Sequence, residues 1–160
     1  MDFPHLLVRF AEAVQRNDGA GLAALFTPDG VYEDGFFGPH GGPDAIAAML
    51  QRFHDGGRDY WWEFHTPVLA GDTGYASWRF SYASRRQGME GQPVLFEGLS
   101  RFTLKEGRIA HYYEVFDRGL ALAQQGYPAA GIASVSAKAA ARQNAKPENR
   151  WHLARFATTG

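Results

Sequence analysis

The sequence predicts an α+β fold: a cone-shaped, curved antiparallel sheet packed against N-terminal helices. Two observations predict it. The first third of the chain carries apolar residues at helical spacing, and residues 60–117 contain four strand-like runs joined by short glycine-rich turns. Helices followed by a run of strands is the α+β arrangement, and helices that close one face of a curved sheet leave a pocket inside it.

The N-terminal elements follow from spacing and from chain-breaking residues. Apolar residues from Leu6 to Phe26 repeat at helical intervals on both sides of residues 17–19, Asn-Asp-Gly, which predicts one helix and then a second, short one. A turn at residues 28–30 leads into a short strand at 31–34. A further helix begins near Pro43 and Asp44, and its apolar face consists of Ile46, Met49, Leu50 and Phe53.

The strand-like runs are YWWEFHTPVLA, GYASWRFSYASR, VLFEGLSRFTL and RIAHYYEVFD. The connections GDTG, QGMEGQP and KEG are short and contain glycine, so the strands are expected to meander antiparallel. We therefore predict one domain over residues 1–128. Residues 129–160 form an alanine-rich tail that is either partly ordered or docks at an interface, with residues 134–143 helical by propensity.

Composition limits the function classes. The net charge of −1 predicts neither a nucleic-acid partner nor an anionic membrane partner, and no apolar stretch is long enough to span a membrane. Cysteine is absent, which excludes disulfides and thiol catalysis and allows a cytoplasmic location; no signal peptide is predicted. The aromatic share of 14% is high, and aromatic residues supply both protein cores and the walls of small-molecule pockets.

No cofactor is predicted. The six histidines show no metal-ligand spacing, and no glycine-rich nucleotide motif is present. We expect His65 and His111 to approach each other on adjacent strands. Because the aromatic strands have a second face that needs cover, we also expect a homodimer.

Three segments resemble the nuclear transport factor two-like superfamily, in its branch of SnoaL-like polyketide cyclases and ketosteroid isomerases. They are FTPDGVYEDGFFGPHGGPDAIAAML, LKEGRIAHYYEVFD and DRGLALAQQGYP, and the likeness covers about residues 6–128. The resemblance implies cofactor-free acid/base chemistry of isomerase, cyclase or lyase type on a small hydrophobic carbonyl or polyketide-like molecule. The same fold also serves non-catalytic binding and association modules, which remain the alternative.

The last strand carries the main catalytic candidate. If its alternation is unbroken, His111, Tyr113 and Asp117 share one face. In SnoaL-like relatives an aromatic residue and an aspartate at this spacing line the cavity, which implies an acid/base role for Asp117 beside Tyr113. The alternative is that Asp117 only caps the helix that follows.

A second pair lies on residues 31–34, where Tyr32 and Asp34 face together as further catalytic candidates. In relatives like limonene epoxide hydrolase, a tyrosine and an asparagine at this spacing hold a reacting water. Those relatives also carry Arg-x-Asp on a central strand, where this chain has Arg79 but Ser81. Epoxide hydrolysis with an incomplete residue set is therefore a further alternative.

Arg79 lies on the polar face of its strand, which points either outward or into the cavity as a substrate ligand. Glu97 and Arg101 share a face of the next strand and are expected to pair with each other. The remaining predicted substrate-binding residues are Trp62, His65 and His111, beside Tyr113.

Overall fold

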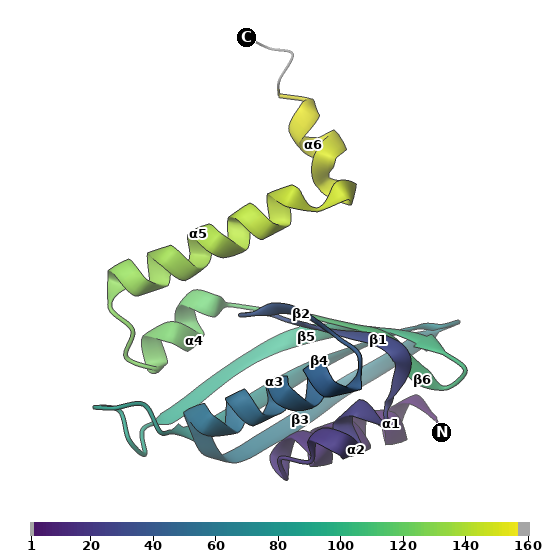
Figure 1. Ribbon diagram of the computed structural model, residues 1–160, viewed down its shortest axis with the longest axis horizontal. Helices are drawn as coiled ribbons and strands as arrows, with labels where there is room; N and C mark the ends of the chain where they lie inside the picture. Colours follow the sequence, from purple (N-terminus) through teal and green to yellow (C-terminus); the bar gives the residue numbers. More distant parts are fainter. Residues whose placement is uncertain (1, 157–160) are drawn as a thin grey trace.

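A computed structural model describes residues 2–156 and shows helices packed on one six-stranded sheet (Figure 1). The N-terminal half contains α1 (Phe3–Gln15), α2 (Gly19–Ala23), β1 (Phe26–Asp34), β2 (Gly38–Gly41) and α3 (Pro43–Gly56). The sheet continues with β3 (Gly57–Ala70), β4 (Thr73–Ser84), β5 (Pro93–Lys105) and β6 (Arg108–Phe116). The chain then forms α4 (Arg118–Gln124), α5 (Ala129–Ala145), a short turn of 3-10 helix (Pro147–Asn149) and α6 (Arg150–Ala154).

The strand order is β2-β1-β6-β5-β4-β3, and the sheet curves without closing. The predicted α+β class and the meander of β3 to β6 are confirmed. One detail differs: β1 pairs with β6 in parallel, so the sheet is mixed. Strand β2 was not predicted either, because its sequence GPHG has no alternating apolar residues and is rich in residues that favour turns.

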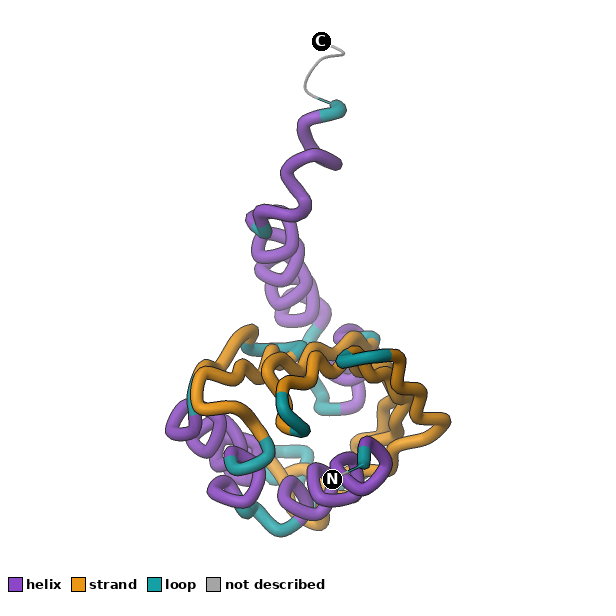
Figure 2. The backbone as a smooth tube through the Cα atoms, turned by 90° about the vertical axis from the view of Figure 1, so that its right-hand side faces the viewer, coloured by secondary structure: helices purple, strands orange, loops and turns teal. Residues whose placement is uncertain are grey.

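Helices α1 and α3 lie in the curve of the sheet (Figure 2), and apolar residues of α1, α2 and α3 belong to one buried core with it. Asp2 caps α1 by accepting a hydrogen bond from the His5 amide, and Pro4 occupies the first turn. Phe10 reaches the centre of the interior, where its ring lies 5.8 Å from that of Tyr32 and 5.0 Å from that of Tyr112. The inside of the cone is therefore filled with aromatic rings near the sheet centre.

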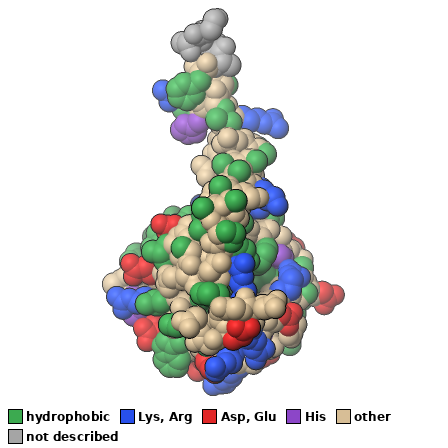
Figure 3. Space-filling model, turned by 90° about the vertical axis from the view of Figure 1, so that its left-hand side faces the viewer, with side chains coloured by type: hydrophobic (Ala, Val, Ile, Leu, Met, Phe, Trp, Pro, Cys, Tyr) green, Lys and Arg blue, Asp and Glu red, His purple; other side chains and the backbone are tan. Residues whose placement is uncertain are grey.

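The C-terminal residues are helical and lie on the opposite side of the sheet from α1 and α2 (Figure 1). Helix α5 contacts α4, and α6 projects away from the body (Figure 3). No residue of α5 is fully buried. Within residues 2–156, no helix is long and apolar enough to cross a membrane.

Candidate acid/base site

Two carboxyl groups lie side by side inside the sheet. Asp34 ends β1 and is 3% exposed, while Glu114 lies on β6 and is 4% exposed. The parallel strands pair Glu33 with Tyr113, so the next residue of each strand, Asp34 and Glu114, also lie next to each other and share the inner face. Buried acidic side chains are rare unless they are partnered.

The turn after β1 supplies most of the partners. The amides of Phe36 and Phe37 donate to Asp34 Oδ1 at 2.8 and 2.6 Å, and the Gly35 amide donates to Glu114 Oε1 at 3.0 Å. A side chain on Gly35 would collide with the ring of Phe116, so glycine allows the turn to approach β6 this closely. Asp34 Oδ2 is buried and meets no N–H or hydroxyl donor in residues 2–156, while the protonated Glu114 carboxyl donates to the Asp34 carboxylate.

A chain of hydrogen bonds reaches Glu114 from the middle of the sheet. Trp78 Nε1 donates to Ser100 Oγ at 2.8 Å, Ser100 Oγ donates to the Tyr112 hydroxyl at 2.8 Å, and Tyr112 donates to Glu114 Oε2 at 2.6 Å. The indole nitrogen can only donate, so it fixes the direction of the whole chain. Glu114 therefore accepts hydrogen bonds at both of its oxygens.

These surroundings shift the proton affinities of the pair. Burial, together with the negative charge of Asp34, raises the pKa of Glu114 to about 8. Burial also raises the pKa of Asp34, while the amides of Phe37 and Phe36 oppose that rise by stabilising the carboxylate. Two carboxyl groups in contact do not both ionise readily, so the charge of Asp34 helps Glu114 to keep its proton to higher pH.

Tyr32 completes the site. It is fully buried on the inner face, and its ring centroid lies 4.4 Å from that of Tyr112. Burial raises its pKa well above the usual value, and the charges of Glu114 and Asp34 add to this, so Tyr32 stays a neutral donor. The predicted shared face of Tyr32 and Asp34 is what the structure shows.

The predicted cavity position of Asp117 is wrong. Asp117 is exposed, and its carboxyl accepts a hydrogen bond from the Leu120 amide at 3.0 Å as the N-cap of α4. The reason is a β-bulge: Leu104 pairs with Ile109 but Thr103 pairs with His111, which leaves Ala110 as an extra residue on β6. An extra residue reverses which side chains point inward from that point on.

Before the bulge, Ile109 points inward. After it, Tyr112, Glu114 and Phe116 point inward, and His111 and Tyr113 point outward. Glu114 was therefore not among the predicted site residues. One signal for it was available, since the face of Tyr112 and Phe116 is the more aromatic of the two.

The other predicted substrate-binding residues lie on both the inner and the outer face of the sheet. Trp62 is 5% exposed and points inward, but Arg79 is on the outer face and pairs with Glu97 at 3.7 Å. His65 lies 3.6 Å from Glu63, and His111 lies 3.1 Å from Glu33, so both histidines also face outward.

His65 and His111 do not meet, because β4 and β5 lie between their strands. Arg101 lies over the ring of Tyr113 and does not pair with Glu97 as expected. No group of three or more possible metal ligands occurs in the described part of the chain.

An aromatic cavity of about 260 Å³ borders the turn that follows Asp34, although neither carboxyl group of the pair lines it. Phe36, which follows the turn that binds Asp34, lines this cavity and packs 4.9 Å from Phe116. The other walls come from α3, β3, β4, β5 and the C-terminal helices, and include Phe53, Tyr60, Phe80, Tyr82, Phe96, Tyr127 and Val135. Its lining suits a small apolar molecule.

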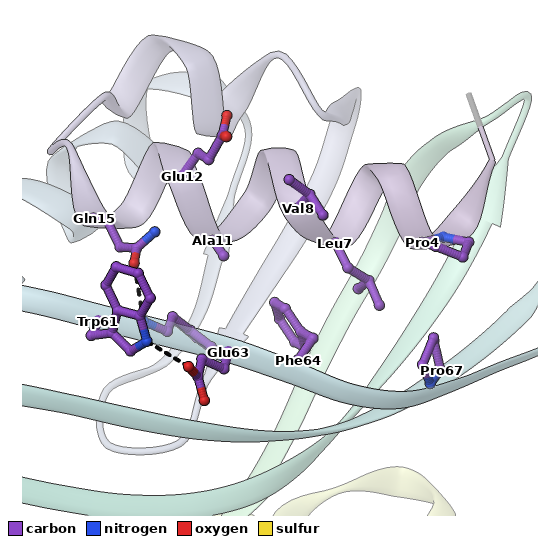
Figure 4. A pocket seen from close by; sticks show the side chains of 11 residues that line it. Pro4, Leu7, Val8, Ala11, Glu12, Gln15, Trp61, Glu63, Phe64 and Pro67 are labelled. Carbon is purple, nitrogen blue, oxygen red and sulfur yellow. Dashed lines mark hydrogen bonds between the residues drawn. The ribbon is translucent and has the colours of Figure 1, made fainter.

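A second hollow lies between α1 and the edge strand β3, away from the acid pair (Figure 4). Leu7 and Phe64 form its apolar part, and Trp61 donates to Glu63 at 2.8 Å beside it. It contains no buried acid, so it lacks the proton-transfer groups of the first site.

Comparison with known proteins identifies the family. A family model described as a SnoaL-like domain matches residues 7–112. The chain is similar to a ketosteroid-isomerase-like protein of Catenulispora acidiphila, solved with trimethylamine (20% identity, TM-score 0.71, covering 79% of this chain and 96% of that one). It is also similar to a polyketide cyclase candidate from Sinorhizobium meliloti (29% identity, TM-score 0.54, covering 72% and 97%).

A third similar structure is an epoxide hydrolase of Mycobacterium tuberculosis that resembles limonene epoxide hydrolase (20% identity, TM-score 0.61, covering 75% and 86%). The search of curated proteins finds no match. The fold is that of the nuclear transport factor two-like proteins. Because the family model spans more than half of the sequence, the chain belongs to the SnoaL-like domain family.

Proposed function

We propose that the protein is a cofactor-free acid/base enzyme, of isomerase, cyclase or lyase type, that acts on a small hydrophobic carbonyl compound. The observation that carries this proposal is the buried pair of Asp34 and Glu114. A general base works best when its pKa lies near the working pH, and burial shifts both carboxyl groups in that direction.

The geometry supplies a role for each group. Asp34, whose pKa burial raises toward the useful range, takes a proton from the carbon next to the carbonyl once the substrate reaches the buried pair. The Tyr32 hydroxyl, which stays protonated, donates to the carbonyl oxygen as negative charge develops there. Asp34 then returns the proton to another carbon, and Glu114 holds the second carboxyl proton of the pair.

An enolisation assay with simple ketones tests the proposal. The protein is incubated in deuterated water with cyclohexanone or acetophenone, and NMR follows deuterium entry next to the carbonyl. Asp34→Asn and Glu114→Gln are expected to lower the enzyme-dependent rate by about 10²-fold or more, while Asp117→Asn keeps it. Equal rates in Asp34→Asn and the native protein would refute the catalytic role of the pair.

A second candidate function is water activation for epoxide opening. In this proposal Glu114, which lies beside Asp34, takes the part of the acid that Ser81 replaces, and Tyr32 and Asp34 position the water. Similarity to an epoxide hydrolase fold favours testing this chemistry. Epoxides in heavy-oxygen water separate the two: labelled diol formation supports hydrolysis, and ketone exchange without diol supports the first function.

Failure of both assays, with an apolar ligand still bound in the aromatic cavity, would support the non-catalytic binding module. We also propose a homodimer through the outer face of the sheet. Exposed apolar side chains gather there, namely Leu95, Leu99 and Val115. Sedimentation equilibrium at micromolar concentration should show a dimer, and a monomer would contradict this.

A further inference from the structure

Helix α5 lies over the acid pair, although it falls outside the residues matched by the family model. A small cavity is lined by Asp34 and Glu114 together with residues of α5. The α5 residues are Ala139, Arg142 and Gln143, and Lys146, which caps the helix, also lines the cavity. One turn earlier, Val135 lines the aromatic cavity. The helix therefore borders both parts of the proposed site.

These contacts come from a single face of the helix. Positions 135, 139, 142, 143 and 146 follow helical spacing. Val135, Ala139 and Lys146 are half-buried, whereas their neighbours Ser136, Lys138 and Ala140 are exposed. Arg142 and Gln143 also line the small cavity but are exposed, so the helix is covered along Val135, Ala139 and Lys146 and open to solvent beside them.

Two cations of α5 and its cap fasten the chain on both sides of Asp34. Lys146 Nζ donates to Glu33 Oε1 at 2.6 Å, at the residue before Asp34. Arg142 Nη2 donates to the backbone oxygen of Phe36 at 2.9 Å, two residues after Asp34. Because the amides of this same turn hold both carboxyl groups, these outer bonds are linked to the site through the backbone.

We infer that α5 forms a wall of the acid site, and that Arg142 and Lys146 are positioning residues that hold the turn after Asp34 and exclude water from the two carboxyl groups. An effect of Arg142 and Lys146 on catalysis rests on the proposed function. Their effect on the turn after Asp34 does not depend on it. Neither side chain touches Asp34 or Glu114 through a hydrogen bond, so both act through the turn and through Glu33.

The wall also has an electrostatic consequence. The main cause of the raised pKa of Glu114 is burial, so entry of water lowers that pKa toward its ordinary value of 4.5. Loss of two nearby cations would instead raise the pKa of Glu114. A fall in this pKa therefore indicates that water has entered the site. The titratable and charged groups around Glu114 are Tyr32, Glu33, Asp34, His111, Tyr112, Tyr113, Arg118, Arg142 and Lys146.

Hydrogen–deuterium exchange on the full chain tests the inference. In the double variant Arg142→Ala/Lys146→Ala, the amides of Gly35, Phe36 and Phe37 are expected to exchange about tenfold faster or more, because the turn opens more often. The NMR titration midpoint of Glu114 should fall. The matched control Lys138→Ala/Arg150→Ala removes the same charge from exposed positions of the tail and should change neither quantity.

Lys146→Arg preserves a donor to Glu33 and is expected to keep native exchange. Native exchange rates for residues 35–37 in the double variant, or equal acceleration in the control, would overturn the inference. This test can fail independently of the proposed function. Faster exchange in the double variant, with no ketone or epoxide turnover in the native protein, supports the wall and contradicts the proposed catalysis. Turnover with unchanged exchange rejects the wall alone.

Discussion

Tyr112 donates its hydroxyl hydrogen to Glu114 at 2.6 Å, and both side chains are buried on the same face of β6. The hydroxyl cannot turn away, because Ser100 already donates to it and Trp78 donates to Ser100. Each buried atom in this chain is satisfied only while the others are present, so the chain ties three neighbouring strands to the state of one carboxyl group.

Tyr112→Phe should therefore destabilise the protein by about 1–3 kcal/mol, since it leaves the Ser100 hydroxyl without an acceptor and Glu114 Oε2 without a donor. Denaturant unfolding measures this loss. Tyr113→Phe is the matched control: it makes the same chemical change on the outer face of β6 and should stay within about 0.5 kcal/mol of the native protein. Equal losses in both variants would contradict the ordered chain.

The stability of the protein should fall as pH rises through the range set by Glu114. Its pKa is raised from 4.5 to about 8, so the folded state binds the proton more tightly than the unfolded state does. The stabilising contribution is complete below the unfolded pKa and is lost as pH rises toward the folded one. Asp34, whose pKa is also raised, acts in the same direction.

Glu114→Gln removes this titration, so its unfolding free energy should change less with pH than that of the native protein between roughly pH 5.5 and pH 8.5. Glu97→Gln, at an exposed acid paired with Arg79, should keep the native slope. A Glu114→Gln slope equal to the native one would show that Glu114 does not bind its proton differently in the folded state.

Asp117 should behave as a helix cap. Asp117→Ala is expected to cost about 1 kcal/mol through loss of the bond to the Leu120 amide, whereas Asp117→Asn should cost little because asparagine caps nearly as well. Neither change should affect deuterium entry into ketones. A large loss of exchange in Asp117→Asn, with the fold intact, would return the catalytic role to Asp117.

The aromatic cavity should bind small apolar ketones, and Val135→Trp should block it. Val135 lines the cavity from α5 and is only half-buried, so a larger side chain there fills the space without overpacking the core. Thermal shift with acetophenone reports binding, because a ligand of the folded state raises Tm. Val8→Trp, in the other hollow, is the control. An equal shift in Val135→Trp would exclude this cavity as the binding site.

The class of the fold follows from the sequence because helical spacing and strand alternation are local signals that burial enforces. Tyr32 and Asp34 were placed correctly since β1 alternates without interruption from Val31 to Asp34. Glu114 was missed because one extra residue, Ala110, reverses the faces of β6. A bulge depends on how two strands pair, and neither strand alone shows it. Lys146 is likewise distant in sequence from Glu33, and only the docked helix brings them together.

The most direct test of the account is the titration of the Glu114 carboxyl group, followed by carbon-detected NMR and assigned by its loss in Glu114→Gln. If this group is buried beside Asp34 and titrates in the range useful for proton transfer, its midpoint lies near pH 8. The midpoint should move down in Asp34→Asn, where the neighbouring negative charge is absent. A midpoint near the ordinary value of 4.5, unchanged in Asp34→Asn, would contradict it.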